Sequence, residues 1–592
     1  MAVALGAIGL CQLLPGLAGL PLLLPIAVWL GRGARRLRPV PRTALDIPII
    51  LFGGTAVLGA IVAYDPAAAW NKVWLIAGGI VLFYAVARQP QENLWPIAGF
   101  LVLSAALLST AVLLTRILGQ AGSLPSSAAG WWMAAAQTLL RAPAVEVVQG
   151  ILTLLLAFPI ALALRGFKSG HRGLGALAAL AGVVTVSGLA STGSMSAWLS
   201  LIGSCVLACL FGLGLLSRKR RLTTVVLLAL AVVGATAIVP GALARMSQGL
   251  YAAQVSRLPG MTDVLSRVEV ARQSRYLVED YIWTGAGLAS FPGQYSQYIR
   301  VVPVASQDGS HNTLLDVVLE QGVFGLLALL WIWAGSIGLL VDGRLASDTD
   351  DTGLLAAAAF SALSLLALHG LAEDPLYGSR AAPLLFLLPG IAVALAGRTP
   401  DSTGDARPSA LVPWRISSRA KVPIAAGLAL ILIAAGVGFG KAIMSSLQSN
   451  LGSVEMARVQ LSDWPTGEWE DGRTASRLRL AEARFESALR WEMANRTAHY
   501  RLGLIHLLSR EFDDAVGHLS QAQLLSPHHR GVRKTLGYSL AWAGSLDQAA
   551  SILAGIPEAQ QELEIYVWWW GTQDRPDLAA QAERVASLLP AP

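Results

Sequence analysis

The segment LWPIAGFLVLSAALLSTAVLL, residues 94–114, indicates the fold class because it carries no charged side chain. A helix of about 20 apolar residues crosses the hydrocarbon core of a bilayer, and this segment has that length. Similar apolar runs occur at 3–31, 45–63, 73–87, 147–164, 173–190, 196–216, 223–243, 322–341, 353–371, 381–397 and 423–443. The prolines in the first run leave open whether it forms one kinked helix or two short ones. The sequence therefore predicts an all-α, polytopic membrane helical bundle of about 10–13 transmembrane helices, with about twelve expected.

The composition of the whole chain agrees with a membrane protein. Of its 592 residues, 54% are hydrophobic and 14% are charged, against roughly 25% charged in an ordinary soluble domain. So few charges could not cover such a core in water, which excludes a cytosolic enzyme, a disordered chain and a secreted disulfide scaffold. The net charge of +7 does not indicate nucleic-acid binding, because many basic residues lie in short loops between apolar runs.

Basic residues in the short loops predict the orientation of the bundle. Clusters follow the first apolar run and recur at 165–172, 218–221 and 407–421, all on one side if the spans alternate. We expect that side to be cytoplasmic, in a multi-pass protein of the plasma or inner membrane. The opposite, external side then holds a large loop at about 244–321 and everything after residue 443.

After residue 443 the apolar runs give way to amphipathic helices with an internal repeat. Gly503 recurs as Gly537 and Leu519 recurs as Leu553, and both offsets equal the tetratricopeptide (TPR) period. We interpret these repeats as a structural or docking module for a protein partner, in preference to a substrate-binding surface. The predicted domains are a transmembrane domain at 1–443, a linker at 444–475 and a TPR-like repeat domain at 476–592.

The external loop is rich in arginine and ends in a histidine. Its arginines are Arg245, Arg257, Arg267, Arg272, Arg275 and Arg300. Guanidinium groups bind phosphate oxygens in bidentate fashion, and His311 has the residue type of a general base near neutral pH. This pattern favours an external site for an anionic, lipid-linked substrate. Local ion pairs such as Arg275 with Glu279, or contacts with lipid headgroups, would explain the same arginines without a site.

Several motifs of this region resemble a known family. The matching residues are Arg267, Asp280, Gly285, Gly287 and Phe291, then His311, Asn312, Gly322 and Gly325, then His369, Gly370, Leu371, Glu373 and Asp374, with Tyr64, Asp65 and Pro66 in a short external turn. This pattern resembles the O-antigen ligase and O-antigen polymerase superfamily of membrane glycosyltransferases. The chain departs from it at Ala271, where the family has Trp, and at Met195, where many members have a second phosphate-binding Arg.

The resemblance implies transfer of a glycan from an undecaprenyl-pyrophosphate-type carrier to an acceptor hydroxyl on the extracytoplasmic face. It implies a metal-independent, inverting glycosyltransferase of the O-antigen ligase type, acting in lipopolysaccharide and cell-envelope biosynthesis. Arg267 would bind the pyrophosphate, and His311 would orient or deprotonate the acceptor hydroxyl. In place of the missing second Arg we expect Arg272 or Arg275. Further candidate site residues are Asn312, His369 and Asp374.

No cofactor and no metal site are expected, because the chain has no Walker A, HExxH or CxxC motif. The expected partners are the lipid-linked glycan donor, a lipid- or protein-linked acceptor, membrane lipids and a protein bound by the repeats. Within the family, a polysaccharide polymerase or a protein O-oligosaccharyltransferase stays open. Outside it, the alternatives are a non-catalytic membrane scaffold that presents the repeats and, more weakly, a transporter.

Overall fold

A computed structural model of the chain describes residues 43–120, 142–212, 261–302, 307–345, 350–396, 418–462 and 476–589. These residues form helices and no strands. Six of their helices are long and apolar enough to cross a membrane, and three shorter helices are also apolar. The all-α, polytopic membrane fold is therefore confirmed. The runs predicted at 3–31 and 223–243 lie outside the described residues.

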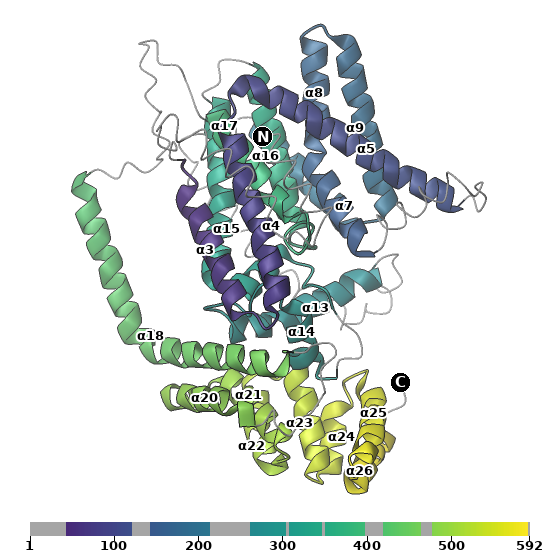
Figure 1. Ribbon diagram of the computed structural model, residues 1–592, viewed down its shortest axis with the longest axis vertical. Helices are drawn as coiled ribbons and strands as arrows, with labels where there is room; N and C mark the ends of the chain where they lie inside the picture. Colours follow the sequence, from purple (N-terminus) through teal and green to yellow (C-terminus); the bar gives the residue numbers. More distant parts are fainter. Residues whose placement is uncertain are drawn as a thin grey trace.

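The membrane helices form two groups that share one helix. The helices are α3 (Asp46–Val62), α4 (Pro66–Ala87), α5 (Leu94–Gln120), α7 (Ala142–Leu155), α8 (Ala157–Lys168), α9 (Arg172–Thr192), α10 (Met195–Gly212), α15 (Thr313–Leu345), α16 (Asp350–His369) and α17 (Leu387–Ala396), with short 3-10 turns η3 (Gln91–Asn93) and η6 (Ala382–Phe386). One group contains α3, α4, α15 and α17, and the other contains α5 and α7 to α10. Helix α16 packs against both groups, as Figure 1 shows.

The outer faces of these helices suit a lipid environment. Leu103 on α5 and Leu177 on α9 are exposed, whereas Phe83 and Phe360 are fully buried between helices. Apolar side chains that would be unfavourable in water are expected where a helix faces lipid. The amphipathic contrast familiar from soluble helices is therefore weak in this part of the chain.

Helix α15 begins earlier than the apolar run predicted at 322–341. Its first residue is Thr313, and its first turns contain the buried polar residues Asp316, Glu320 and Gln321. Hydropathy alone could not include them, because their partners lie far away in the sequence: Lys72 forms an ion pair with Glu320 at 2.6 Å. The segment before α15, predicted to be an external loop that continues to about residue 321, therefore ends at residue 312.

An intermediate layer lies between the membrane helices and the C-terminal helices (Figure 1). It contains α13 (Met261–Asp280), α14 (Phe291–Tyr295) and the π-helical turn η5 (Ser296–Arg300). Helix α18 (Ser418–Gln460) descends beside the bundle and then bends to run across it. It passes through residue 444 without a break, so the first part of the segment predicted as a linker is helical.

The C-terminal region is an array of helices stacked in pairs. Its helices are α20 (Arg479–Trp491), α21 (Arg496–Leu508), α22 (Phe512–Leu525), α23 (Arg530–Trp542), α24 (Leu546–Leu553), α25 (Ala559–Thr572) and α26 (Pro576–Leu588). A Cβ at Gly503 would lie 2.5 Å from Leu519 Cγ, and one at Gly537 would lie 2.5 Å from Leu553 Cγ. The repeat in the sequence is thus also a repeat in the packing. The TPR class itself stays a prediction.

The intermediate layer and the C-terminal helices share one hydrophobic core, which includes Tyr281, Tyr298, Tyr500 and Trp542. The Tyr500 hydroxyl donates to the Tyr298 carbonyl at 2.7 Å. His529 is also fully buried here. Its ring stacks on Tyr276 with the centroids 4.5 Å apart, a contact between segments that are distant in the chain.

Candidate functional site

The arginine of the first motif pairs with the glutamate of the last. Arg267 on α13 donates through Nη1 to Glu373 Oε1, and Glu373 follows directly after α16. The same carboxylate accepts from Ser196 Oγ at 2.6 Å, and its other oxygen lies 3.0 Å from His369 Nε2. Burial alone would raise the pKa of Glu373, but these hydrogen bonds and charges outweigh it and lower the pKa to about 2. Glu373 is therefore a fixed anion that orients Arg267.

His311 lies close to this pair in a backbone conformation that is unusual for a side-chain-bearing residue, with φ at +55°. Its Nε2 lies 2.9 Å from the amide nitrogen of Gln307. An amide nitrogen only donates, so the contact assigns the lone pair to Nε2 and the ring proton to Nδ1. Burial and the positive charge of Arg267 lower the pKa of His311. The ring is therefore neutral near pH 7, with its basic nitrogen toward Gln307.

Asn312 joins the second and third motifs. Its Oδ1 accepts from the backbone nitrogens of Leu314 and Leu315 and so caps α15. Its Nδ2 donates to the Leu371 carbonyl at 2.8 Å. Thr313 reinforces the junction, because its Oγ1 donates to Asp374 Oδ1 at 3.0 Å. Asn312 and Asp374 thus hold the start of α15 against the end of α16 and fix His311 between them.

His369 is fully buried and both of its ring nitrogens have partners. Nε2 contacts Glu373, and Nδ1 lies 3.3 Å from Thr153 Oγ1. His369 therefore supports the carboxylate that orients Arg267.

Arg267 and His311 line the same cavity, whose volume is about 360 Å³. Its lining residues are Ser266, Arg267, Glu269, Val270, Tyr295, Arg300, Gln307, His311 and Arg530. The lining therefore contains three guanidinium groups, from α13, η5 and α23, and one carboxylate, that of Glu269. Arg272 forms an ion pair with this carboxylate at 2.8 Å. The cavity as a whole is cationic and of a size usual for a small-ligand site.

The structure does not bring the two other predicted phosphate-binding arginines to the cavity. Arg272 is not among the lining residues and pairs with Glu269. Arg275 is largely exposed and pairs with Glu279 at 3.7 Å. Arg300 and Arg530 are in the lining instead. No local signal marks Arg530, because it lies in the repeat region and reaches the cavity only through tertiary packing.

Glycines of the first two motifs allow backbones to approach closely. Gly287 has a φ of +105°, and a Cβ there would lie 2.4 Å from Ala63 Cα. Gly322 has a φ of +70° and breaks α15, so that a Cβ would lie 2.5 Å from the Trp283 carbonyl oxygen. These positions seat the segment after α13 against α3 and α15. They fix the orientation of α13, and with it Arg267.

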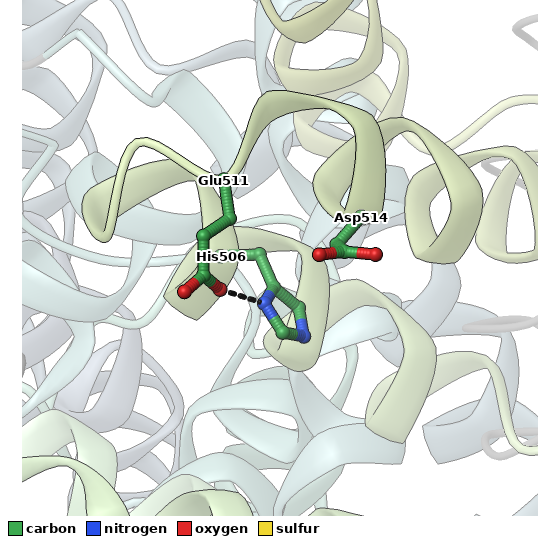
Figure 2. Close-up of side chains that lie close together, drawn as sticks. All are labelled: His506, Glu511 and Asp514. Atoms are coloured by element: carbon green, nitrogen blue, oxygen red, sulfur yellow. Dashed lines mark hydrogen bonds and ion pairs between the residues drawn. The ribbon is translucent and has the colours of Figure 1, made fainter.

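One group of metal-ligating residue types lies close together in the described part of the chain, away from this cavity. His506, Glu511 and Asp514 place ligand atoms within 4.8 Å of one another on the repeat helices, as Figure 2 shows. His506 Nδ1 already contacts Glu511 Oε2 at 2.6 Å. The two side chains therefore satisfy each other through this contact, and neither of them lines the cavity.

The fold and this cavity define a multi-pass membrane protein with an arginine-and-histidine site beside the ends of its helices. A family model described as O-antigen ligase matches residues 177–330. The matched stretch includes Arg267 and His311, and it confirms the resemblance to the O-antigen ligase superfamily. The match indicates a glycosyltransferase-like activity in general and suggests lipid-linked glycans as substrates. No curated protein and no solved structure matches the chain.

Proposed function

We propose that this protein transfers a glycan from an undecaprenyl-pyrophosphate-type carrier to an acceptor hydroxyl on the extracytoplasmic face of the plasma or inner membrane. The observation that carries the proposal is that Arg267 and His311 line one cavity. Such a transfer needs a cation where the pyrophosphate charge develops and a base where the hydroxyl loses its proton. The two residues provide one of each.

The reaction we propose is a single displacement with inversion. The acceptor oxygen forms a bond to the anomeric carbon of the donor sugar, and the bond from that carbon to the pyrophosphate oxygen breaks. His311 Nε2 takes the hydroxyl proton, and the pyrophosphate leaves against Arg267. The arginines supply the positive charge that the leaving group requires, so the proposed reaction uses no metal ion.

The neutral state of His311 supports its role as the base. Its Nε2 faces the Gln307 amide, which donates to it as an acceptor hydroxyl would. We infer that the acceptor displaces this amide when it binds. Glu373 and His369 are positioning residues in this scheme, because they act on Arg267 and do not line the cavity.

The test is transfer from a purified lipid-pyrophosphate glycan to candidate acceptors. Replacing His311 by Ala should lower the rate about 100- to 10,000-fold, the usual contribution of a general base, and Arg267→Ala should also abolish transfer. Arg275→Ala is the matched control, because Arg275 is on the same helix but outside the cavity. Full transfer by the His311 variant would refute the proposal and favour the non-catalytic scaffold.

The products of the inactive variants in cells separate the family alternatives. Loss of a ligase leaves long lipid-linked chains unattached, whereas loss of a polymerase leaves single repeat units. Transfer to protein hydroxyls would identify an oligosaccharyltransferase. A reporter fused after residue 592 should lie outside the cytoplasm, and a cytoplasmic signal would contradict the proposed topology.

A further inference from the structure

We propose that Arg530, from the repeat region, is a second ligand of the donor pyrophosphate and completes the binding site together with Arg267. This inference rests on the proposed function and extends it to a residue outside the membrane domain. The observation that carries it is that Arg530 on α23 and Arg267 on α13 line the same cavity. A pyrophosphate carries more than one negative charge, so one guanidinium group would leave it incompletely neutralised.

The turn at 194–197 contains Met195, the position at which many members of the similar family have a second phosphate-binding arginine. Ser194 and Ser196, on either side of Met195, both donate to Glu373 Oε1, at 3.3 Å and 2.6 Å. Glu373 in turn pairs with Arg267. This turn therefore adjoins the site, and the residue at its centre is methionine, which cannot bind phosphate. A second cation must come from another element, and the lining residues available are Arg300 and Arg530.

Arg530 has donors left for a ligand. Its Nε donates to Glu558 Oε1 at 2.7 Å, and its Nη2 also donates to Glu558. Those two bonds use two of the five N–H groups of a guanidinium, so three remain. The side chain is 30% exposed, and it lines the cavity with Tyr295. Glu558 lies behind the lining and orients Arg530 as Glu373 orients Arg267.

The backbone around Arg530 is fixed to the intermediate layer. The Arg530 backbone N–H donates to Gln273 Oε1 on α13 at 3.1 Å. A Cβ on Gly531 would lie 2.1 Å from the Tyr298 carbonyl oxygen, so α23 and η5 are in direct contact. Lys534, one turn further on, donates to the Arg300 carbonyl. Arg530 is therefore held at the cavity by contacts with both α13 and η5.

The repeat region is then part of the active site as well as a candidate docking module. The repeat region contributes the positive charge of Arg530 at the place where the leaving group forms. The residues that carry this contribution are far from the family motifs in the sequence. This explains how the chain can lack the second motif arginine and still bind a pyrophosphate.

The experiment measures donor KM and kcat in the full-length protein with the purified lipid-pyrophosphate glycan, and inhibition by inorganic pyrophosphate. Arg530→Ala should raise donor KM and weaken pyrophosphate inhibition, each roughly tenfold or more, the scale of a lost charge-assisted hydrogen bond. Arg530→Lys should recover part of the loss, because the charge remains. Arg533→Ala is the matched control: Arg533 lies on the same helix and donates to the Ile552 carbonyl, outside the cavity lining.

Two results would overturn the inference. One is an unchanged donor KM and pyrophosphate inhibition in Arg530→Ala while Arg267→Ala abolishes transfer, which leaves the proposed function intact. The other is equal loss in the Ala and Lys variants together with an equal fall in melting temperature, which indicates a purely structural role. If Arg267→Ala and His311→Ala both keep full activity, the proposed function fails instead.

Discussion

Replacing Asp280 by Asn should destabilise the junction between the intermediate layer and the repeats by about 3–5 kcal/mol, the cost of breaking a buried ion pair. Asp280 Oδ2 accepts from Arg501 Nη2 at 2.8 Å, and its Oδ1 lies 2.8 Å from Arg496 Nη1. Asp280 and Arg501 have no exposed side-chain surface, and Arg496 is 8% exposed. Asparagine fills the same volume but leaves the fully buried guanidinium group of Arg501 without a counter-charge, whereas Arg496 keeps its ion pair with Glu279 at 3.1 Å.

The assay is chemical denaturation of the detergent-solubilised protein followed by tryptophan fluorescence, since Trp542 and Trp570 report on the repeats. Adding Arg501→Met to Asp280→Asn should recover part of the loss, because it removes the uncompensated charge. The control is Asp577→Asn, in an exposed pair with Arg575, where no measurable change is expected. A loss below about 1 kcal/mol for Asp280→Asn would refute the reasoning, because it would mean that water reaches the pair.

The pH dependence provides a second measurement on the same residue. Burial alone would raise the pKa of Asp280, but Arg496, Arg501 and the Thr497 hydroxyl outweigh it and lower the pKa. A depressed folded-state pKa means that the stabilisation is complete above the unfolded value of about 3.9 and is lost as the pH falls through the folded value. The Asn variant should lose this acid-side dependence.

Three further predictions concern the cavity and its supports. Because the pKa of His311 is lowered, its base form persists to lower pH, so kcat/KM for transfer should decline in acid with a midpoint below about 6.5; a midpoint above that value would contradict the assignment. Glu373→Gln keeps the shape of the side chain but removes the anion that orients Arg267, and should lower transfer by roughly tenfold or more in a steady-state assay with no change in expression; equal rates would show that Arg267 needs no orientation. Gly287→Ala should reduce the yield of folded protein in detergent, because its Cβ would meet Ala63; a normal yield and melting temperature would refute the close approach.

Local patterns in the sequence predicted the membrane helices and two residues of the site, Arg267 and His311. The run at 94–114 became α5 because its hydropathy needs no distant partner. The start of α15 could not be found in this way, because buried Glu320 is satisfied by distant groups, an ion pair with Lys72 on α4 and a hydrogen bond from the Ala289 backbone N–H. Burial of a charge is decided by the partner that satisfies it, and that partner is not adjacent in the chain.

The family motifs named Arg267 and His311, and the structure places both in one cavity. The motif acid Asp280, in contrast, pairs with two arginines of the repeat region, and Arg272 pairs with Glu269. A spacing pattern identifies the type of residue at a position. It does not identify the side chain that neutralises it.

The sequence by itself determined that this is an all-α membrane protein with an arginine-and-histidine loop and a helical repeat, because hydropathy and periodicity are properties of contiguous residues. Only the tertiary structure decided which arginines face the cavity, because guanidinium groups on α13, η5 and α23 converge through packing between distant segments. Arg530 is the clearest case. Its place at the cavity depends on contacts of the repeats with α13 and η5, and no local pattern encodes such contacts.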